Sequence, residues 1–171
     1  MFKIRDCILT LLMILMFSAA AYNQEIKGTF AIKNVVTGML LRPLDANNKN
    51  KTPIVAYTPT NWKCMTWDFN HVEGNTYYLR NLFTSKTFQA VTTELNEGVL
   101  LEQQPLDENN KLQQWEFVSV EKNVFAIRLK GTDYYVTPSE ENGTPNSKII
   151  LSKKRSDKLQ YWTIYEQHPT M

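Results

Sequence analysis

The stretch KLQQWEF, Lys111–Phe117, places a glutamine two residues before a tryptophan at the start of an alternating apolar segment. Related stretches lie on either side of it: CMTWDF at Cys64–Phe69 and LQYWTI at Leu159–Ile164. In CMTWDF, Met65 takes the place of the glutamine. The tryptophans of the three stretches are separated by 48 and 47 residues. A nearly constant spacing of this size indicates a structural unit that is repeated along the chain.

The spacing divides the chain into three segments, residues 28–72, 74–120 and 123–167. Each segment opens with an alternating stretch, TFAIKN, TYYLRN or VFAIRL, which has the period of a half-buried strand. A short turn follows, then a second apolar stretch (MLLRP, KTFQAV or YYVTP) and a third (PIVAY, VLLEQ or KIILS). With the tryptophan stretch as the fourth, the sequence predicts four strands in each segment and an all-β protein.

Three copies of a four-stranded unit limit the architecture. β-Propellers also repeat four strands, but they close with about four to eight blades. The prediction is therefore a β-trefoil, in which three units pack around a pseudo-threefold axis and share one core. Trp67, Trp115 and Trp162 are expected to fill that core, which is a scaffold role rather than a catalytic one. Gln113 and Gln160 are expected to satisfy buried backbone groups beside the core.

The first 21 residues have the pattern of a secretory signal peptide. Lys3 and Arg5 precede the apolar run CILTLLMILMF, and the small residues SAAA follow it. The run is shorter than the roughly 20 residues that a membrane-spanning helix needs, so cleavage after Ala21 is favoured over a membrane anchor. The run is not followed by the cysteine of a lipoprotein signal. The protein is therefore expected to be secreted or periplasmic, with one domain at residues 22–171.

The composition of residues 22–171 excludes several classes of function. The segment holds 17 Lys and Arg against 16 Asp and Glu, a balance that does not attract a polyanion, so no nucleic-acid partner is expected. Cys64 is its one cysteine and no zinc-ligand spacing occurs, so neither a disulfide nor a metal or other cofactor is expected. His71 and His168 have no nucleophile or metal ligand at a useful spacing. No insertion into a membrane is expected.

These residues resemble a known family, the ricin-B-like or R-type lectin β-trefoils. The resemblance rests on the Gln-x-Trp motifs QQW and QYW, on the weaker copy MTW, and on the openings TFAIKNVVTGMLL and TYYLRNLFTSKTFQA. It covers essentially all of residues 22–171. It implies a carbohydrate-binding protein with a shallow sugar pocket in each repeat. In each pocket it implies an acidic residue at the end of the second strand, an aromatic platform after the third, and an amide shortly before the Gln-x-Trp motif.

Transferred to this chain, the implied sugar contacts are best preserved in the first repeat. Arg42 stands at the acidic position, Asp45 follows three residues later, and Tyr57 stands at the platform position. The ring would cover the apolar face of a sugar, and the carboxylate would accept hydrogen bonds from its hydroxyls. Arg42 could instead donate to an acidic or sulfated sugar. Trp62, close to Tyr57 in sequence, is either a loop side chain packed against the barrel or a second stacking surface.

The other two repeats keep less of the implied pattern. The second repeat has Gln89 at the acidic position, Gln103 at the platform position and Asn110 before the motif. The third repeat has Thr137 and Ser152 at the first two positions, with no aromatic ring and no amide. At most one or two of the three implied sites are therefore expected to bind a sugar.

The sequence leaves two functions open. The first is a secreted, non-catalytic carbohydrate-binding module that recognises glycans. Its candidate contacts are Arg42, Asp45, Tyr57, Trp62, Gln89 and Gln103. The second is a protein-binding β-trefoil, such as a protease inhibitor, whose exposed loops would block the cleft of a protein partner. A glycosidase is not expected, although acidic residues cluster at positions 94–108, because its two carboxylates need a deep cleft between them.

Overall fold

The computed structural model describes residues 25–171, which form twelve β-strands and four short 3₁₀ segments. The predicted signal peptide lies outside the described residues. The strands are β1 (Gly28–Asn34), β2 (Leu40–Pro43), β3 (Ile54–Tyr57), β4 (Thr66–Glu73), β5 (Thr76–Asn81), β6 (Thr87–Ala90), β7 (Val99–Gln104), β8 (Trp115–Glu121), β9 (Val124–Leu129), β10 (Tyr134–Pro138), β11 (Ser147–Lys153) and β12 (Tyr161–Glu166). The 3₁₀ segments are η2 (Leu44–Ala46), η3 (Lys63–Met65), η4 (Lys111–Gln113) and η5 (Lys158–Gln160). Between residues 25 and 171, no helix is long and apolar enough to cross a membrane.

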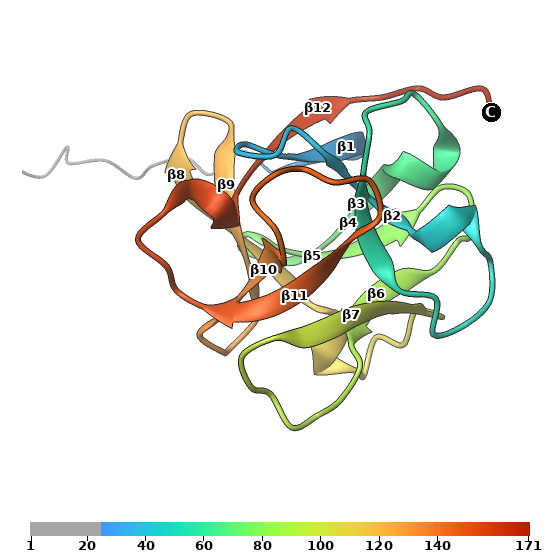
Figure 1. Ribbon diagram of the computed structural model, residues 1–171. Coiled ribbons are helices and arrows are strands. Elements are labelled where there is room, and N and C mark those ends of the chain that lie inside the picture. Colours follow the sequence, from blue (N-terminus) through green and yellow to red (C-terminus); the bar gives the residue numbers. More distant parts are fainter. Residues whose placement is uncertain (1–24) are drawn as a thin grey trace, which may run out of the picture.

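Six of the strands form a closed barrel (Figure 1). Around it, β1 pairs with β4, β4 with β5, β5 with β8, β8 with β9, β9 with β12, and β12 with β1. The other six strands form three hairpins, β2–β3, β6–β7 and β10–β11. The second strands of these hairpins meet through the β3–β11 and β11–β7 pairs and a bridge between Pro53 and Glu102. A six-stranded barrel with one hairpin from each repeat confirms the predicted β-trefoil.

The strands form because apolar and polar residues alternate, so that one face of each barrel strand enters the core. In β8, Trp115 and Phe117 are buried, whereas Glu116 and Val118 are partly exposed. Pairing in a closed ring leaves the barrel strands no free edge. The predicted strand stretches therefore fold as the alternation indicates.

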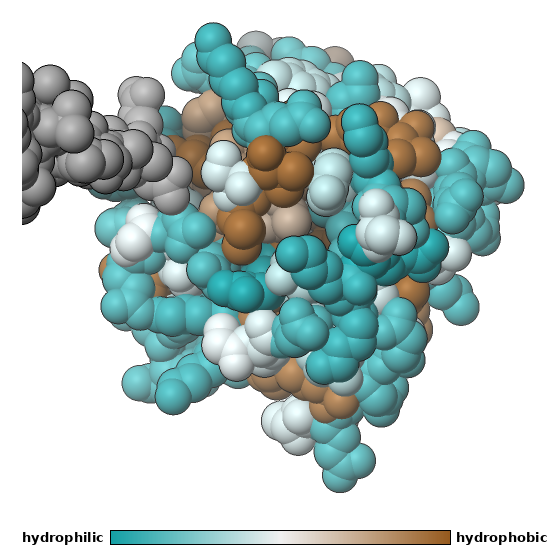
Figure 2. Space-filling model, turned by 90° about the vertical axis from the view of Figure 1, so that its left-hand side faces the viewer, coloured by the Kyte–Doolittle hydropathy of each residue, from teal (hydrophilic) through white to brown (hydrophobic). Residues whose placement is uncertain are grey.

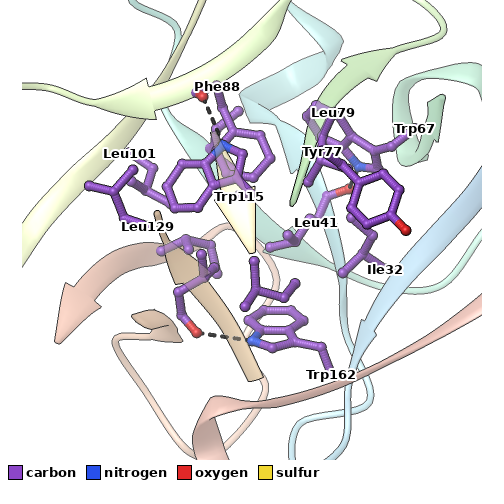
Figure 3. Close-up of a cluster of buried hydrophobic side chains, with 14 of the residues drawn as sticks. Ile32, Leu41, Trp67, Tyr77, Leu79, Phe88, Leu101, Trp115, Leu129 and Trp162 are labelled. Atoms are coloured by element: carbon purple, nitrogen blue, oxygen red, sulfur yellow. Dashed lines mark hydrogen bonds between the residues drawn. The ribbon is translucent and has the colours of Figure 1, made fainter. Parts of the chain in front are cut away.

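The core lies inside the barrel and holds the three repeat tryptophans, each 0% exposed (Figure 3). Each indole N–H donates to a backbone carbonyl in the second strand of its own repeat, so burial leaves no unpaired indole donor. The pairs are Trp67 with Leu41 at 3.1 Å, Trp115 with Phe88 at 3.2 Å, and Trp162 with Val136 at 2.9 Å. This burial and bonding confirm that the tryptophans belong to the scaffold.

Candidate functional site

The indole hydrogen bonds define which residues of the three repeats are equivalent. The acceptor carbonyls belong to Leu41, Phe88 and Val136. The residues that follow them are Arg42, Gln89 and Thr137. These are the residues that the sequence places at the acidic position of the implied sugar pocket. The structure and the sequence therefore agree on the first position of each candidate site.

The register across the hairpins corrects the platform position of the second repeat. The three acceptor residues pair with Ala56, Gln103 and Leu151. The next residues along those strands are Tyr57, Gln104 and Ser152. Gln104, rather than Gln103, is therefore the equivalent of Tyr57. The sequence analysis aligned the first residues of PIVAY and VLLEQ, Pro53 and Val99. In the structure Val99 lies one position earlier in its repeat than Pro53, so the predicted platform position in the second repeat is one residue too early.

Gln103 is buried, with 1% of its surface exposed. Its amide nitrogen donates to the carbonyls of Asn47 and Lys49, each at 2.6 Å, and so holds the loop between β2 and β3 against β7. These two bonds use both hydrogens of the amide. Gln103 therefore stabilises a neighbouring loop and offers no amide hydrogen to a ligand.

In the first repeat, Arg42 covers one face of the ring on which a sugar is expected to stack. Its guanidinium carbon lies 3.5 Å from the centroid of the Tyr57 ring, a cation–π contact. Its terminal nitrogen donates to the Asn146 side chain at 3.0 Å and lies 3.5 Å from the exposed Asp45 carboxylate. The Nε atom is buried and has no partner within the described residues. A ligand of the first repeat would therefore meet a positive charge stacked on the ring.

Trp62 occupies the N-cap of η3, the position held by Asn110 in η4 and by Asp157 in η5. The asparagine and aspartate side chains accept the backbone N–H two residues later, whereas an indole has no acceptor. Trp62 is 38% exposed and forms one wall of an apolar surface hollow of about 400 Å³. The other lining residues are Ala46, Lys63, Cys64, Phe83 and Met171. Tyr57 is not among the residues that line this hollow.

In the first repeat, an apolar side chain occupies the buried position two residues before the core tryptophan, where the other two repeats have a glutamine. Met65 is fully buried at the position equivalent to Gln113 and Gln160. Beside it, burial raises the pKa of the Cys64 thiol, and the nearby Arg42 guanidinium partly opposes that rise. The first repeat therefore combines the buried Arg42 cation with the Cys64 thiol and the Met65 thioether.

The second repeat brings four half-buried polar side chains together on its hairpin and on η4. Gln89 Oε1 accepts hydrogen bonds from Asn110 Nδ2 and Gln113 Nε2, both at 2.9 Å. Across the hairpin, Gln89 pairs with Glu102, whose carboxylate accepts from Gln104 Nε2 at 2.7 Å. Gln89, Glu102, Gln104 and Asn110 are all partly exposed. The site thus presents one carboxylate among three amides.

Gln113 anchors this group from below, as the sequence predicts for the Gln-x-Trp glutamine. Besides Gln89, its amide nitrogen bonds the Pro105 carbonyl at 3.0 Å, and its oxygen accepts from the Asp107 N–H at 2.8 Å. The sequence analysis did not identify Glu102 or Gln104 as site residues. Glu102 was grouped with the other acidic residues, and Gln103 was placed at the platform position instead of Gln104. The alternation of Glu102 with Gln104 on β7, opposite Gln89, is the signal that could have found both.

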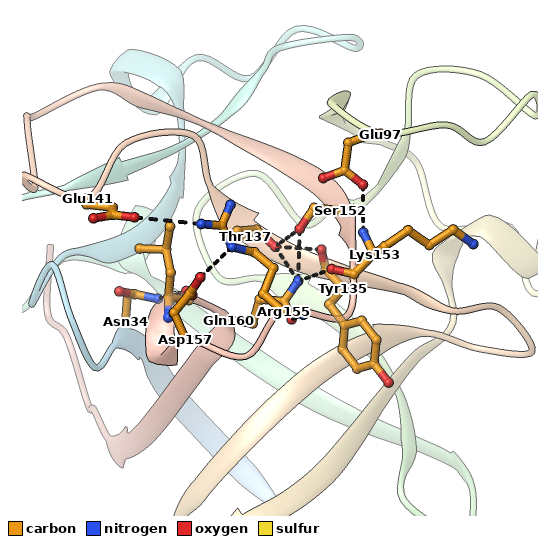
Figure 4. Close-up of polar contacts among 11 residues, drawn as sticks. Asn34, Glu97, Tyr135, Thr137, Glu141, Ser152, Lys153, Arg155, Asp157 and Gln160 are labelled. Atoms are coloured by element: carbon orange, nitrogen blue, oxygen red, sulfur yellow. Dashed lines mark hydrogen bonds and ion pairs between the residues drawn. The ribbon is translucent and has the colours of Figure 1, made fainter.

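In the third repeat the equivalent polar groups are buried and bonded to one another (Figure 4). Gln160 Nε2 lies 2.8 Å from Ser152 Oγ and 3.2 Å from Thr137 Oγ1, and the two hydroxyls are 2.7 Å apart. Gln160 also donates to the Lys153 carbonyl and accepts from the Arg155 N–H. This confirms the predicted role of Gln160 and leaves little for a sugar to contact.

Comparison with known proteins shows the family of the chain. A family model described as "Ricin-type beta-trefoil lectin domain-like" matches residues 63–152, which is more than half of the sequence. The chain belongs to this family. No curated protein sequence matches it.

Solved structures similar to this ricin-type trefoil share its fold. A designed threefold-symmetric protein, ThreeFoil, superposes with a TM-score of 0.77 at 13% identity, covering 82% of this chain and 99% of that one. The Macrolepiota procera ricin B-like lectin, solved with lactose, gives a TM-score of 0.71 at 24% identity, with coverages of 86% and 100%. The Rhizoctonia solani agglutinin gives 0.75 at 19% identity, with the same coverages. The matches span whole lectin chains and support the trefoil architecture.

Charged groups of this ricin-type trefoil lie mainly at its surface. Arg155 bonds Asp157 at 2.7 Å and, with the cap to Leu159, keeps the pKa of the Asp157 carboxyl below its ordinary value (Figure 4). His168 lies beside Glu166, and His71 contacts the Gly74 carbonyl. Across residues 25–171, no group of three His, Cys, Asp or Glu side chains is arranged to hold a metal ion.

Proposed function

We propose that this chain is a secreted, non-catalytic carbohydrate-binding module and that its second repeat holds the glycan. The observation that carries the proposal is the group formed by Gln89, Glu102, Gln104 and Asn110. Sugar hydroxyls need paired acceptors and donors in a shallow, partly exposed site, and one carboxylate among three amides supplies both. Family membership and the sugar-bound lectin among the structural neighbours support the same class of ligand.

The first repeat is proposed as a second site, for glycans that carry a carboxylate or sulfate. Arg42 is buried and stacked on Tyr57, and its Nε is without a partner among the described residues. The guanidinium would attract an anionic sugar group, whereas a neutral sugar would have to displace it from the ring. Asp45, with 73% of its side chain exposed, flanks the site. Trp62 would contribute only to a ligand long enough to reach the adjoining hollow.

The non-catalytic character rests on the layout of the second repeat. Glycoside hydrolysis requires two carboxyl groups on either side of the scissile bond. Glu102 is the one carboxylate in the four-residue group, and it is bonded to Gln104. Secretion rests on the pattern of residues 1–21 and is checked by sequencing the N-terminus of the exported protein, which should begin at Tyr22.

A glycan array followed by calorimetry tests the proposed glycan site. The array identifies ligands of residues 22–171, and each is then titrated against Glu102→Gln and Gln89→Ala. A hydrogen bond to a charged group contributes about 1.5–3 kcal/mol, so Glu102→Gln should weaken binding by about 10- to 100-fold. Glu94→Gln is the matched control, because Glu94 is an exposed carboxylate of the same repeat outside the group.

Three outcomes would overturn parts of the proposal. Unchanged affinity of Glu102→Gln would remove the glycan from the second repeat. Loss of binding in Tyr57→Ala, with the second-repeat variants unaffected, would place the main site on the first repeat. If the array is empty and the protein instead inhibits a protease in a way that free sugar does not relieve, the protein-binding alternative holds and the lectin function is wrong.

A further inference from the structure

The apolar hollow beside Trp62 lies next to the C-terminal end of the chain, which Figure 1 marks. Five of its six lining side chains are apolar, and its volume of about 400 Å³ is within the range of small-molecule pockets. Viewed from the left of Figure 1, by contrast, the molecule is mainly hydrophilic, with hydrophobic atoms in gaps between polar side chains (Figure 2). An exposed apolar hollow serves either the scaffold or a ligand, and the three repeats allow the first role to be tested.

The scaffold does not require an aromatic ring at Phe83. Backbone N–H groups in three equivalent turns donate to the carbonyls of the residues just before the core tryptophans, and the donors are Leu82, Val35 and Lys130. The residues that follow these donors are Phe83, Val36 and Gly131. Two of the three turns therefore form the same hydrogen bond without an aromatic residue.

Nor does the scaffold require an aromatic ring at Trp62. The equivalent N-cap residues of the other repeats, Asn110 and Asp157, accept a backbone hydrogen bond that an indole cannot accept. Trp62 is 38% exposed and Phe83 is 50% exposed. This junction therefore gathers two exposed rings at positions where neither other repeat has one. Grouped exposed apolar side chains of this kind mark a binding surface.

The segments that form the walls of the hollow also carry an excess of positive charge. Residues 44–52, 62–64 and 82–86 hold one carboxylate, Asp45, and four lysines, Lys49, Lys51, Lys63 and Lys86. Lys86 Nζ donates to the Asn48 carbonyl at 2.7 Å, which ties the turn to the loop. Among residues 25–171, none of the four lysines forms a salt bridge. Because residues 22–171 as a whole are nearly balanced in charge, this excess is a local property of the surface and attracts anions.

The size and chemistry of the hollow favour a small ligand that is neither a protein nor a plain sugar. A stable protein interface uses roughly 20–30 residues a side, far more than the six that line the hollow. Sugar hydroxyls would find few hydrogen-bonding partners among five apolar walls. An apolar group would be removed from water there, and an anionic group on the same molecule would meet the lysines.

We propose that this hollow binds an anionic amphiphile, a single molecule with an apolar chain or ring and a carboxylate, sulfate or phosphate head. The apolar part lies between Trp62 and Phe83, and Lys63 at the rim attracts the head. The site is separate from the group around Gln89 and from the Tyr57 ring. It therefore goes beyond the proposed glycan-binding function and does not depend on it.

Decanoate, kept below its micelle-forming concentration, is the probe, and the indole N–H signals of isotope-labelled residues 22–171 are the readout. The four tryptophans give four such signals, and the three core indoles serve as internal references because each is 0% exposed. Decanoate should shift the Trp62 signal and leave the core signals in place. Acetate, which has the head without the chain, should shift none of them. Decanol and decyltrimethylammonium, which lack the negative charge, should bind more weakly than decanoate.

Two substitutions that copy the other repeats remove the rings without introducing a residue foreign to the fold. Trp62→Asn copies the N-cap of η4, and Phe83→Val copies the turn of the first repeat. Each should weaken decanoate binding about tenfold or more, measured by calorimetry, and either variant suffices if the other fails to fold. Lys63→Gln should weaken decanoate about two- to fivefold and leave decanol unchanged. The matched control is Val36→Ala, which trims an exposed apolar side chain outside the hollow and should change nothing.

Four results would overturn the proposal. They are the absence of a Trp62 shift with decanoate, equal binding of decyltrimethylammonium, unchanged affinity in both ring variants, and binding only to vesicles of an anionic phospholipid, which would make the surface a membrane contact. A Trp62 signal that moves with protein concentration alone would assign the hollow to a second copy of the chain and would also refute the amphiphile. Glu102→Gln separates this test from that of the glycan site, because it should leave the decanoate shifts unchanged even if it abolishes glycan binding.

Discussion

Replacing Trp115 by alanine should remove a large share of the stability of the fold. The indole is 0% exposed, its ring centroid lies 4.7 Å from that of Phe88, and its N–H bonds the Phe88 carbonyl at 3.2 Å. Truncating a buried aromatic residue of this kind costs about 3–5 kcal/mol. Leaving the buried carbonyl unpaired accounts for about 1–3 kcal/mol of that loss. A small domain has only about 5–15 kcal/mol in total, so the variant should be folded but fragile.

Urea denaturation followed by tryptophan fluorescence and circular dichroism measures this loss. With a slope of about 2 kcal/mol per molar urea, a loss of about 4 kcal/mol lowers the midpoint by about 2 M. Trp115→Phe keeps most of the ring but not the donor, so it should lose about 1–3 kcal/mol. Trp62→Ala is the control, because that ring is 38% exposed, and its loss should stay below about 1.5 kcal/mol. Equal midpoints for Trp115→Ala and Trp62→Ala would refute the distinction between core and surface tryptophans.

Two further predictions concern the polar groups beside the core. Gln113→Met, which copies Met65 of the first repeat, should lose about 1–3 kcal/mol in the same urea assay, because the Asp107 N–H loses its acceptor; no loss would show that the amide is dispensable. Asp157 has a lowered pKa in the folded protein, chiefly through its bond from Arg155, so it contributes stability above its ordinary pKa of 3.8 that is lost as the pH falls through the lower folded value. Asp157→Asn should therefore show a shallower loss of melting temperature on acidification, and an unchanged acid limb would contradict this.

The fold could be predicted from the sequence because it depends on features that repeat. The spacing of Trp67, Trp115 and Trp162 and the alternation around them are visible in the linear chain, and they determine the barrel and its core. The glutamine two residues before the tryptophan could be assigned to the scaffold for the same reason. Periodicity carries this information because equivalent residues meet equivalent surroundings.

The candidate site was harder to predict because it depends on contacts between segments. The position of Gln104 opposite the second strand is fixed by pairing across a hairpin, and the loop lengths before it differ between repeats. That Arg42 lies on the Tyr57 ring depends on the placement of two side chains on neighbouring strands and on Asn146 from the third repeat. Tyr57 stands at the platform position of the family pattern and Asp45 lies close to the acidic position, but the pattern holds no information about the cation placed on the ring.

The pairing of β1 with β12 sets the timing of folding in the cell. Asn34 in β1 faces Trp162 in β12, so nearly 130 residues must be made between the two partners. At about 5–20 residues per second, that takes on the order of ten seconds. During this interval the partners on that side of β1 do not exist, and an unpaired strand edge is a template for another chain. The newly made protein therefore completes its barrel only after the third repeat has left the ribosome, and until then it is exposed to pairing with its neighbours.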